Sequence, residues 1–149
     1  MELLCFASKT EENIRRGYEA RLWAVSKADN GRRTKARKYL RPGSFGLLYS
    51  GPTHSFTVPF VVKSVADQNR VVTDIWPEPW VLPFEIDPLG SPERRVSARS
   101  AELLWPYLQA KSGKPGGVTA NMNITGVTVF VPNDISEDDW RLILRDLAD

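Results

Sequence analysis

The sequence predicts an α+β domain, built as a curled sheet or small barrel of about six strands with flanking helices. Its 149 residues are the size of one ordinary domain. Apolar residues make up 42% and charged residues 26%, as in an average globular protein, so wholesale disorder is excluded. Short apolar segments bounded by turn residues recur along the chain, interspersed with segments of helical periodicity.

The first third of the chain alternates strands and helices. Residues 2–7 hold four consecutive apolar side chains and predict a buried strand, and residues 22–25 predict a second one. Between them, Thr10 is a candidate cap for a helix whose apolar residues recur at i, i+4 and i+8. Residues 29–31 are expected to form a turn, and residues 32–40 a strongly basic helix.

The central third is richer in strands. Four segments rich in β-branched and aromatic residues lie between turn signals and are predicted as strands: 45–49, 56–65, 70–75 and 82–86. Pro59 interrupts the second of them and indicates a sheet edge or a bulge, because proline cannot donate to the ladder. Residues 76–80, Trp-Pro-Glu-Pro-Trp, predict a rigid aromatic loop, since both prolines fix their backbone angles. Residues 88–95 are expected to be loop.

The last third contains helices and a linker. A helix is predicted at 100–109, with Ser100 as its cap and Pro106 disturbing its last turn. Residues 111–117, Lys-Ser-Gly-Lys-Pro-Gly-Gly, have the composition of a flexible linker. A last strand is expected at 126–131, before an amphipathic helix capped by Ser136. We expect residues 1–110 to form the main unit and residues 118–149 to pack on the same domain.

Composition excludes several classes of protein. One cysteine cannot form an internal disulfide, and one histidine with it cannot build a zinc site without carboxylates or a partner chain. No apolar run is long enough to cross a membrane, and no signal peptide precedes the first strand-like segment. These features predict a soluble, intracellular, cytoplasmic protein with no membrane partner.

The sequence offers no credible catalytic constellation and implies no cofactor or metal. His54 is the only histidine and lies in a turn-like stretch, either as a general base or as a solvated loop residue. Cys5 lies inside an apolar strand and is expected to be a core residue and not a nucleophile. We therefore expect a non-enzyme; a small nuclease that uses His54 is the weakest alternative.

Charge is unevenly distributed along the chain. The net charge is +2, but residues 9–41 hold eleven Lys or Arg and four Asp or Glu, a net of +7 that leaves −5 elsewhere. Such asymmetry indicates one positive face, which suits a polyanion such as nucleic acid. A solvated basic helix with no ligand is the alternative.

The five tryptophans fall into two groups. Trp105 and Trp140 lie among the apolar residues of predicted helices and are expected in the core. Trp23 begins a strand, whereas Trp76 and Trp80 flank the stiff Pro-Glu-Pro loop. Rigid aromatic rings can sandwich a planar base, at about 1–3 kcal/mol per stack. Alternatively, these three rings cover the open end of a barrel.

Three segments together resemble YTH domains. Residues 6–14, Phe-Ala-Ser-Lys-Thr-Glu-Glu-Asn-Ile, precede Leu-Trp-Ala at 22–24 and place a Trp nine residues after Ile14. Residues 45–50 look like the next strand, and residues 74–80 with 84–87 look like the second aromatic loop and the strand after it. The resemblance covers about residues 3–108. It extends to the EVE domains of the PUA-like superfamily, found in modification-dependent restriction systems including those with McrB-type subunits.

The resemblance implies a reader of N6-methyladenine, which YTH domains hold as a flipped base in an aromatic cage. It implies that Trp23 is one wall of the cage and that Trp76 or Trp80 is the other. Asn13, taken as an exposed helix residue, would hydrogen-bond the edge of the base, and the backbone carbonyl of Ala24 would accept from the methylated amine. The implied phosphate contacts are Lys9, Arg32, Arg33, Lys35, Arg37, Lys38 and Arg41.

Several alternatives stay open at this point. Residues 50–59 depart from the YTH pattern, and nothing after residue 109 matches it. EVE-type pockets also accept 5-modified cytosine, and the sequence leaves DNA and RNA equally open. An RNA-binding PUA-like module without modified-base specificity is a further alternative. A nuclease or ATPase, fused or associated, is the expected protein partner of a restriction-type reader.

Overall fold

The computed structural model describes residues 1–124 and 128–149, which form an α+β domain around a sheet of eight strands. The strands are β1 (Glu2–Ser8), β2 (Leu22–Val25), β3 (Phe45–Ser50), β4 (Ser55–Val62), β5 (Val71–Val72), β6 (Trp80–Pro88), β7 (Arg95–Ser97) and β8 (Asn133–Asp134). The helices are α1 (Glu11–Ala20), α2 (Asn30–Tyr39), α3 (Ala98–Leu104), α4 (Pro106–Lys111), α5 (Gly117–Asn121) and α6 (Glu137–Leu147). None of the helices in this described part is long and apolar enough to cross a membrane.

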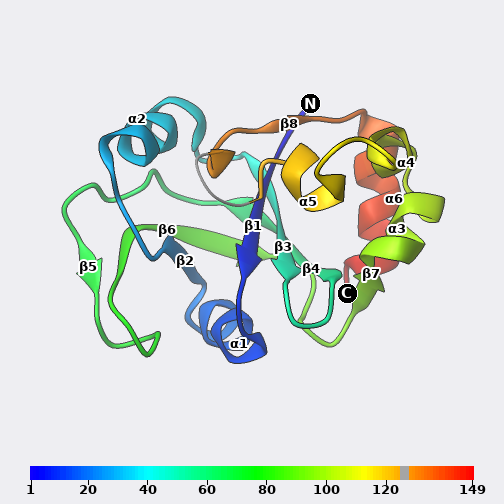
Figure 1. Cartoon of the computed structure of the whole chain (residues 1–149). Helices are drawn as coiled ribbons and strands as arrows, with labels where there is room; N and C mark the ends of the chain where they lie inside the picture. The colour runs from blue at the N-terminus through cyan, green and yellow to red at the C-terminus, as the bar shows by residue number, and fades with distance from the viewer. Residues whose placement is uncertain (125–127) are drawn as a thin grey trace.

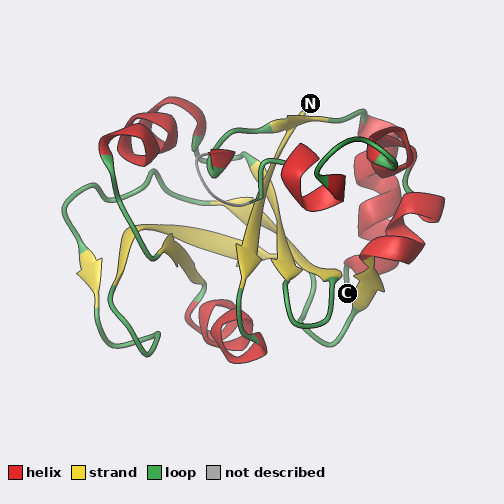
Figure 2. Cartoon of the chain, viewed as in Figure 1, coloured by secondary structure: helices red, strands yellow, loops and turns green. Residues whose placement is uncertain are grey.

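The strand order is β2-β6-β4-β3-β1-β8, with β5 paired to β6 and β7 paired to β4. β1 and β3 run parallel, and the other pairs are antiparallel. The strands cross the middle of the molecule, with α1 and α2 towards one end and α3, α4 and α6 at the other (Figures 1 and 2). The α+β class predicted from the sequence is confirmed, and the described residues hold eight strands where about six were expected.

The sheet separates two apolar cores. Successive side chains of a strand point to opposite faces, so Leu4 and Phe6 enter one core while Leu3 and Cys5 enter the other. The first core includes Trp23 and side chains from α1 and α2, and the second includes side chains from α3 to α6. Because β1 is covered on both faces, it is a continuous apolar run without alternation.

The interruption at Pro59 is a bulge. Leu47 pairs with Pro59 and Leu48 with Thr57, which leaves Val58 as an extra residue with φ 47°. The bulge reading is therefore confirmed. The edge reading is wrong, because β4 lies between β3 and β6. The strand also ends at Val62, three residues earlier than expected.

Two expected helix starts are wrong. Residues 29–31 are not a turn, because the Asp29 side chain accepts a hydrogen bond from the Arg32 amide and caps α2 two residues earlier. The single helix expected at 100–109 is two helices. Ser97 caps the first, and Pro106 begins the second, where its missing N–H costs nothing.

Short strands also differ from expectation. The strand expected at 70–75 is only β5, and β7 begins at Arg95, the last residue of the segment expected to be loop. Of the strand expected at 126–131, residues 126 and 127 lie outside the described residues, and 128–131 are not extended; β8 follows instead and pairs with β1. Two- and three-residue strands carry too few residues for a period-2 pattern, so only their pairing partners define them.

The C-terminal segment packs on the sheet. Turns at 112–116 lead from α4 into α5, whose Val118 joins the second core together with Trp105 and Trp140. Ser136 caps α6 as predicted, in a reciprocal arrangement in which Asp139 accepts from the Ser136 backbone.

Candidate nucleic-acid interface

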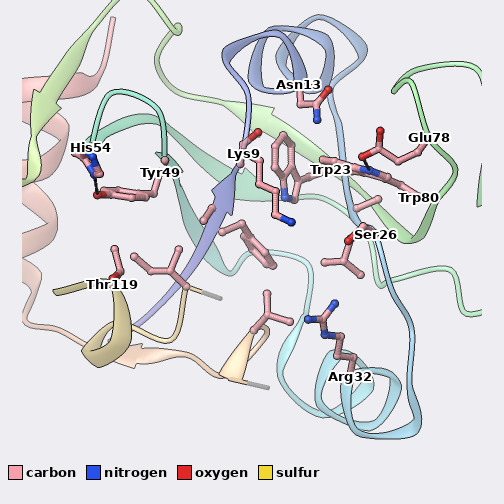
Figure 3. Close-up of a pocket in the computed structure, with 18 residues that line it drawn as sticks. Lys9, Asn13, Trp23, Ser26, Arg32, Tyr49, His54, Glu78, Trp80 and Thr119 are labelled. Atoms are coloured by element: carbon pink, nitrogen blue, oxygen red, sulfur yellow. Dashed lines mark hydrogen bonds between the residues drawn. The ribbon is translucent and has the colours of Figure 1, made fainter. Parts of the chain in front are cut away.

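A cavity of about 500 Å³ lies between the start of β6, the ends of β1 and β2, and α5. Trp23, Trp80 and Asn13 line one end of it, and Tyr49 and His54 line the other (Figure 3). The cavity therefore joins residues from both the N-terminal YTH-like segments and the C-terminal part of the chain.

Two tryptophans form a corner in this cavity, here called the tryptophan corner. The rings of Trp23 and Trp80 are almost perpendicular, with centroids 5.3 Å apart and planes at 79°. Both are buried, at 1% and 6% exposure. The expectation of two rings facing each other across an open slot is wrong, because rings in edge contact leave no room between them. A flat ligand would instead lie on one ring with its edge against the other.

Trp76 supports the corner from behind. It stacks on Trp80 with centroids 4.2 Å apart and does not line the cavity. Its Nε1 donates to the backbone oxygen of Asn13 at 3.1 Å, which fastens the aromatic loop to α1. Arg16 adds a second tie by donating to the Ile75 carbonyl at 3.0 Å. The sequence left open whether Trp76 or Trp80 is the second wall of the cage, and only Trp80 lines the cavity.

Gly17 allows Trp23 its position, and sequence reasoning missed it. A Cβ at Gly17 would lie 2.6 Å from Cε3 of Trp23, so no larger residue fits there without displacing the indole. A glycine inside a helix costs about 1 kcal/mol relative to alanine, so its presence at mid-helix was the available signal.

Asn13 is buried, which corrects the expectation of an exposed helix residue. Its backbone N–H donates to the side chain of Thr10, the helix cap, at 3.1 Å, and its side chain is 6% exposed. Its Oδ1 is fully buried and has no hydrogen-bond partner in the described part of the chain. Leaving such an acceptor unsatisfied costs about 1–3 kcal/mol. Asn13 lines the cavity together with Trp23 and Trp80.

Ala24 lies where β2 departs from regular pairing. Trp23 pairs with Phe84 and Val25 with Val81, so the register shifts at Ala24. Ala24 is buried and lines the cavity beside Trp23. Ala24 therefore lies in the cavity wall at the point where the pairing of β2 with β6 is irregular.

Two of the predicted phosphate contacts reach the cavity. Lys9 and Arg32 line it, and Figure 3 shows their charged ends directed into it from opposite sides. Lys9 is exposed and has no hydrogen-bond or ion-pair partner among the described residues. Arg32 begins α2 and also donates to the Lys27 carbonyl at 3.2 Å.

The other predicted phosphate contacts lie along α2 or just beyond it. Arg33 has a structural role, because its guanidinium donates to the Gln68 carbonyl at 2.5 Å and its own carbonyl accepts from Gln68. Arg37, Lys38 and Arg41 are exposed. Lys35 is half-buried on the same helix. None of these five side chains lines the cavity.

The far end of the cavity holds the only histidine. His54 lies in the β3–β4 turn, and its Nδ1 is 3.4 Å from the hydroxyl of Tyr49. Burial raises the pKa of Tyr49, so this hydroxyl stays protonated at neutral pH.

Two further groups complete the account of the titratable residues. The Glu11 carboxylate accepts hydrogen bonds from Arg95, Ser50 and Thr53. Cys5 does not line the cavity, and burial raises the pKa of its thiol to about 12, so the thiol stays protonated at neutral pH.

Comparison with known proteins identifies the fold. The sequence matches no protein-family model, and no curated protein matches it. Among solved structures, the Mmi1 YTH domain aligns over 95% of this chain and 92% of its own, with 13% identity and a TM-score of 0.57. The YTH domain of Zygosaccharomyces rouxii MRB1, solved in complex with N6-methyladenosine RNA, aligns over 71% of this chain and 68% of its own, with 19% identity and a TM-score of 0.51.

A third structure, of YTH domain-containing protein mmi1 with RNA, aligns over 69% of this chain with 14% identity and a TM-score of 0.51. That alignment spans 63% of the mmi1 chain, less than two thirds of it. This chain therefore has the fold of YTH domains, and the predicted resemblance is confirmed at the level of the fold.

Proposed function

We propose that this domain is a non-catalytic reader of methylated RNA, which takes an extruded N6-methyladenine into the tryptophan corner. The observation that carries the proposal is the unpartnered Oδ1 of Asn13, buried beside the two indoles that line the cavity. Two YTH domains of the same fold were solved with RNA, one of them with N6-methyladenosine RNA.

The chemistry of the corner suits a methylated adenine. The amide of Asn13 presents one acceptor and one donor, which match the N6–H donor and the N1 acceptor of the base. N6-methyladenine carries a single N6–H, so the backbone carbonyl of Ala24 is an alternative acceptor for it, with the amide of Asn13 then donating to N1. A methyl group moved from water onto an indole contributes about 0.8 kcal/mol, or roughly fourfold in affinity. Extruding the base costs a few kcal/mol in a duplex and least in a single strand.

The basic side chains around the cavity would supply the contacts to the phosphate backbone of the RNA. Lys9 and Arg32 at the cavity would bind the phosphates next to the extruded base, and the exposed cations of α2 would attract the strand over a longer distance. Phosphate contacts are blind to base identity, so the preference for methylated adenine would come from the corner.

One observation favours a second function, binding of RNA without modified-base specificity. Trp23 and Trp80 are buried and in contact, as rings that only fill a core would be. A reader of 5-modified cytosine is an alternative to the main proposal. A DNA-binding role in a restriction system with a nuclease or ATPase partner is another alternative, and membership of the PUA-like superfamily is a further proposal. The same corner could hold any flat methylated base.

A titration series separates these functions. Nine-nucleotide RNAs carrying one central adenine, N6-methyladenine, cytosine or 5-methylcytosine, and their DNA counterparts, are titrated calorimetrically into the wild-type domain. We expect the tightest binding to N6-methyladenine in RNA. Equal affinity for all RNAs would reject the reader function and favour the unspecific one.

Two matched variants test the corner itself. Trp80→Phe shrinks a cavity wall, whereas Trp140→Phe shrinks an equally buried ring of the second core, which does not line the cavity. The methyl preference should fall in the first variant and remain in the second. Equal loss in both would mean that the corner acts only as packing.

A further inference from the structure

A polar cluster joins the start of α1, the β3–β4 turn and β7, and the turn lies between the other two elements (Figure 1). Its centre is the ion pair of Arg95 on β7 with Glu11, the first residue of α1. Neither of these two residues lines the cavity. The cluster, here called the Arg95 clamp, consists of Glu11, Ser50, Thr53, Ser55 and Arg95.

The clamp holds the Glu11 carboxylate from three directions. Arg95 donates two hydrogen bonds to it, from Nη1 to Oε1 at 2.9 Å and from Nη2 to Oε2. Ser50 on β3 donates to Oε1 at 2.5 Å, and Thr53 in the turn donates to the same oxygen at 3.2 Å. Paired bonds between a guanidinium and a carboxylate fix the relative orientation of the two groups as well as their distance.

The guanidinium of Arg95 is itself fixed by other contacts. Its Nε donates to the Pro92 carbonyl at 2.9 Å. Its Nη1 also donates to the hydroxyls of Thr53 and Ser55, each at 3.2 Å. A lysine at this position would keep the positive charge, but a single ammonium group cannot reproduce this fork of hydrogen bonds.

The clamp acts on the same helical turn that carries Asn13. With 3.6 residues per turn, residues two positions apart lie about 200° apart around the helix axis. Glu11 therefore holds one face of the first turn of α1, and Asn13 lines the cavity from the opposite face. A rotation of this turn that displaced Glu11 would turn the Asn13 amide through the same angle. Binding groups must be held within about 10–20° of their productive orientation.

The contribution of the ion pair to stability is small by comparison. The side chains of Arg95 and Glu11 are 27% and 41% exposed, and water screens pairs of this kind. A second pair, Arg15 with Glu93 at 2.6 Å, also joins α1 to the segment before β7. In the described part of the chain, only the Arg95 pair is also bonded to the β3–β4 turn. The main consequence of the clamp is therefore geometric.

We propose that Arg95 is a positioning residue of the reader site. Through Glu11 it sets the orientation of the first turn of α1, and so directs the Asn13 amide to the extruded base. Arg95 itself makes no contact with the RNA. The inference rests on the proposed function, because Asn13 is the residue that reads the base there.

A double-mutant cycle tests this role by calorimetric titration with a nine-nucleotide RNA that carries one central N6-methyladenine. In the wild-type background, Arg95→Lys should weaken binding about tenfold, the order expected for one lost base-edge contact. In the Asn13→Leu background the same substitution should have almost no effect, because no amide is left to misplace. Equal losses in the two backgrounds would show that the two residues act independently and would overturn the proposal.

An RNA with an abasic central nucleotide separates positioning from a direct phosphate contact. This RNA keeps every phosphate and lacks only the base that Asn13 reads. Arg95→Lys should therefore bind it as tightly as the wild-type domain does. If Arg95→Lys weakened the abasic and the methylated RNA equally, or weakened neither, Arg95 would not act through the base contact, and the proposal would fail.

Two further variants complete the experiment. Glu11→Gln breaks the ion pair from its other partner, so it should also lose affinity for the methylated RNA and keep affinity for the abasic one. This variant tests the clamp independently of the folding of Arg95→Lys, and unchanged affinity for methylated RNA would overturn the proposal. Arg15→Lys makes the matched change in the second ion pair and should bind both RNAs as the wild type does. Urea denaturation should show unfolding midpoints close to the wild-type value in all three variants.

The wild-type domain alone tests the proposed function. If it binds N6-methyladenine RNA more tightly than adenine RNA and the cycle shows no coupling, the reader function stands and only the role of Arg95 falls. If it shows no preference for the methylated base, the reader function falls, and the inference falls with it.

Discussion

Replacement of Asn13 by leucine should make the domain more stable and a poorer binder. Leucine has nearly the shape of asparagine and no polar atoms, so it fills the same buried site. Asn13→Leu removes an acceptor that the described structure leaves unpartnered, while the caps of α1 and the packing of Trp76 on the Asn13 backbone remain.

The size of both effects follows from the burial of Asn13. A buried polar atom without a partner costs about 1–3 kcal/mol, and the side chain is 6% exposed, so most of that cost applies here. We expect the unfolding free energy to rise by about 1 kcal/mol, at the low end of this range. The gain is reduced because the substitution also removes the amide N–H, which keeps some contact with water in the wild-type domain. For a domain of this length, that raises Tm by about 2–4 °C. Binding of the methylated base should fall by about 1–3 kcal/mol, the contribution of one base-edge contact.

Urea denaturation measures the stability and calorimetric titration with methylated RNA measures the binding. Asn133→Leu is the matched control, because Asn133 is equally buried and its Oδ1 is also unpartnered. Its amide donates to the Leu3 carbonyl at 3.2 Å, far from the cavity lining, so this variant should lose stability and keep its affinity. Loss of stability in Asn13→Leu together with unchanged affinity would refute the assignment of Asn13 as a base contact.

Three further predictions concern packing, charge and pH. Gly17→Ala should lower unfolding free energy in urea by about 1 kcal/mol, because the added Cβ meets Trp23 at 2.6 Å and overpacking outweighs helix propensity; a stabilised variant would contradict this. Replacing both Arg37 and Lys38 by alanine should weaken the binding of methylated and unmethylated RNA alike, and should reduce the slope of log K against log salt by about 1.4 units. Two arginine-to-alanine substitutions on α6 should leave this slope unchanged. An unchanged slope in the α2 variant would mean that these residues are only a solvated surface. Glu11→Gln should weaken the dependence of unfolding free energy on pH at acid pH. Burial raises the Glu11 pKa, but hydrogen bonds from Ser50, Arg95 and Thr53 outweigh this effect and hold the pKa below its ordinary value of 4.5. The wild-type carboxylate thus stabilises the fold above that pH, by about 0.2–1 kcal/mol for a partly exposed ion pair, and loses this as pH falls through its native pKa; parallel curves for both proteins between pH 6 and 3 would refute the role.

Local sequence patterns determined the elements whose signals lie within a few residues. The cap at Thr10, the cap at Ser136 and the strand at 22–25 are where the sequence placed them, because capping and apolar periodicity depend only on neighbours in the chain. The irregularity at Pro59 was also predicted, as an edge or a bulge, since a missing N–H disturbs any ladder, and the structure shows the bulge.

Tertiary structure alone decided how the candidate site is arranged. The sequence placed Trp76 and Trp80 on one stiff loop, but only packing against Trp23 determines which of them reaches the cavity. The burial of Asn13 likewise depends on the aromatic loop that closes over α1, more than sixty residues later in the chain.

The end of the cavity lined by His54 shows the same limit over a longer distance. His54 and Thr119 are unremarkable loop and helix residues in the sequence, and they share a cavity only because the C-terminal segment packs back on the sheet. Periodicity and capping are encoded by short stretches of chain, so the sequence reveals them directly. Strand register, the burial of a polar side chain and the meeting of distant segments result from packing free energy summed over the whole domain, so only the folded structure displays them.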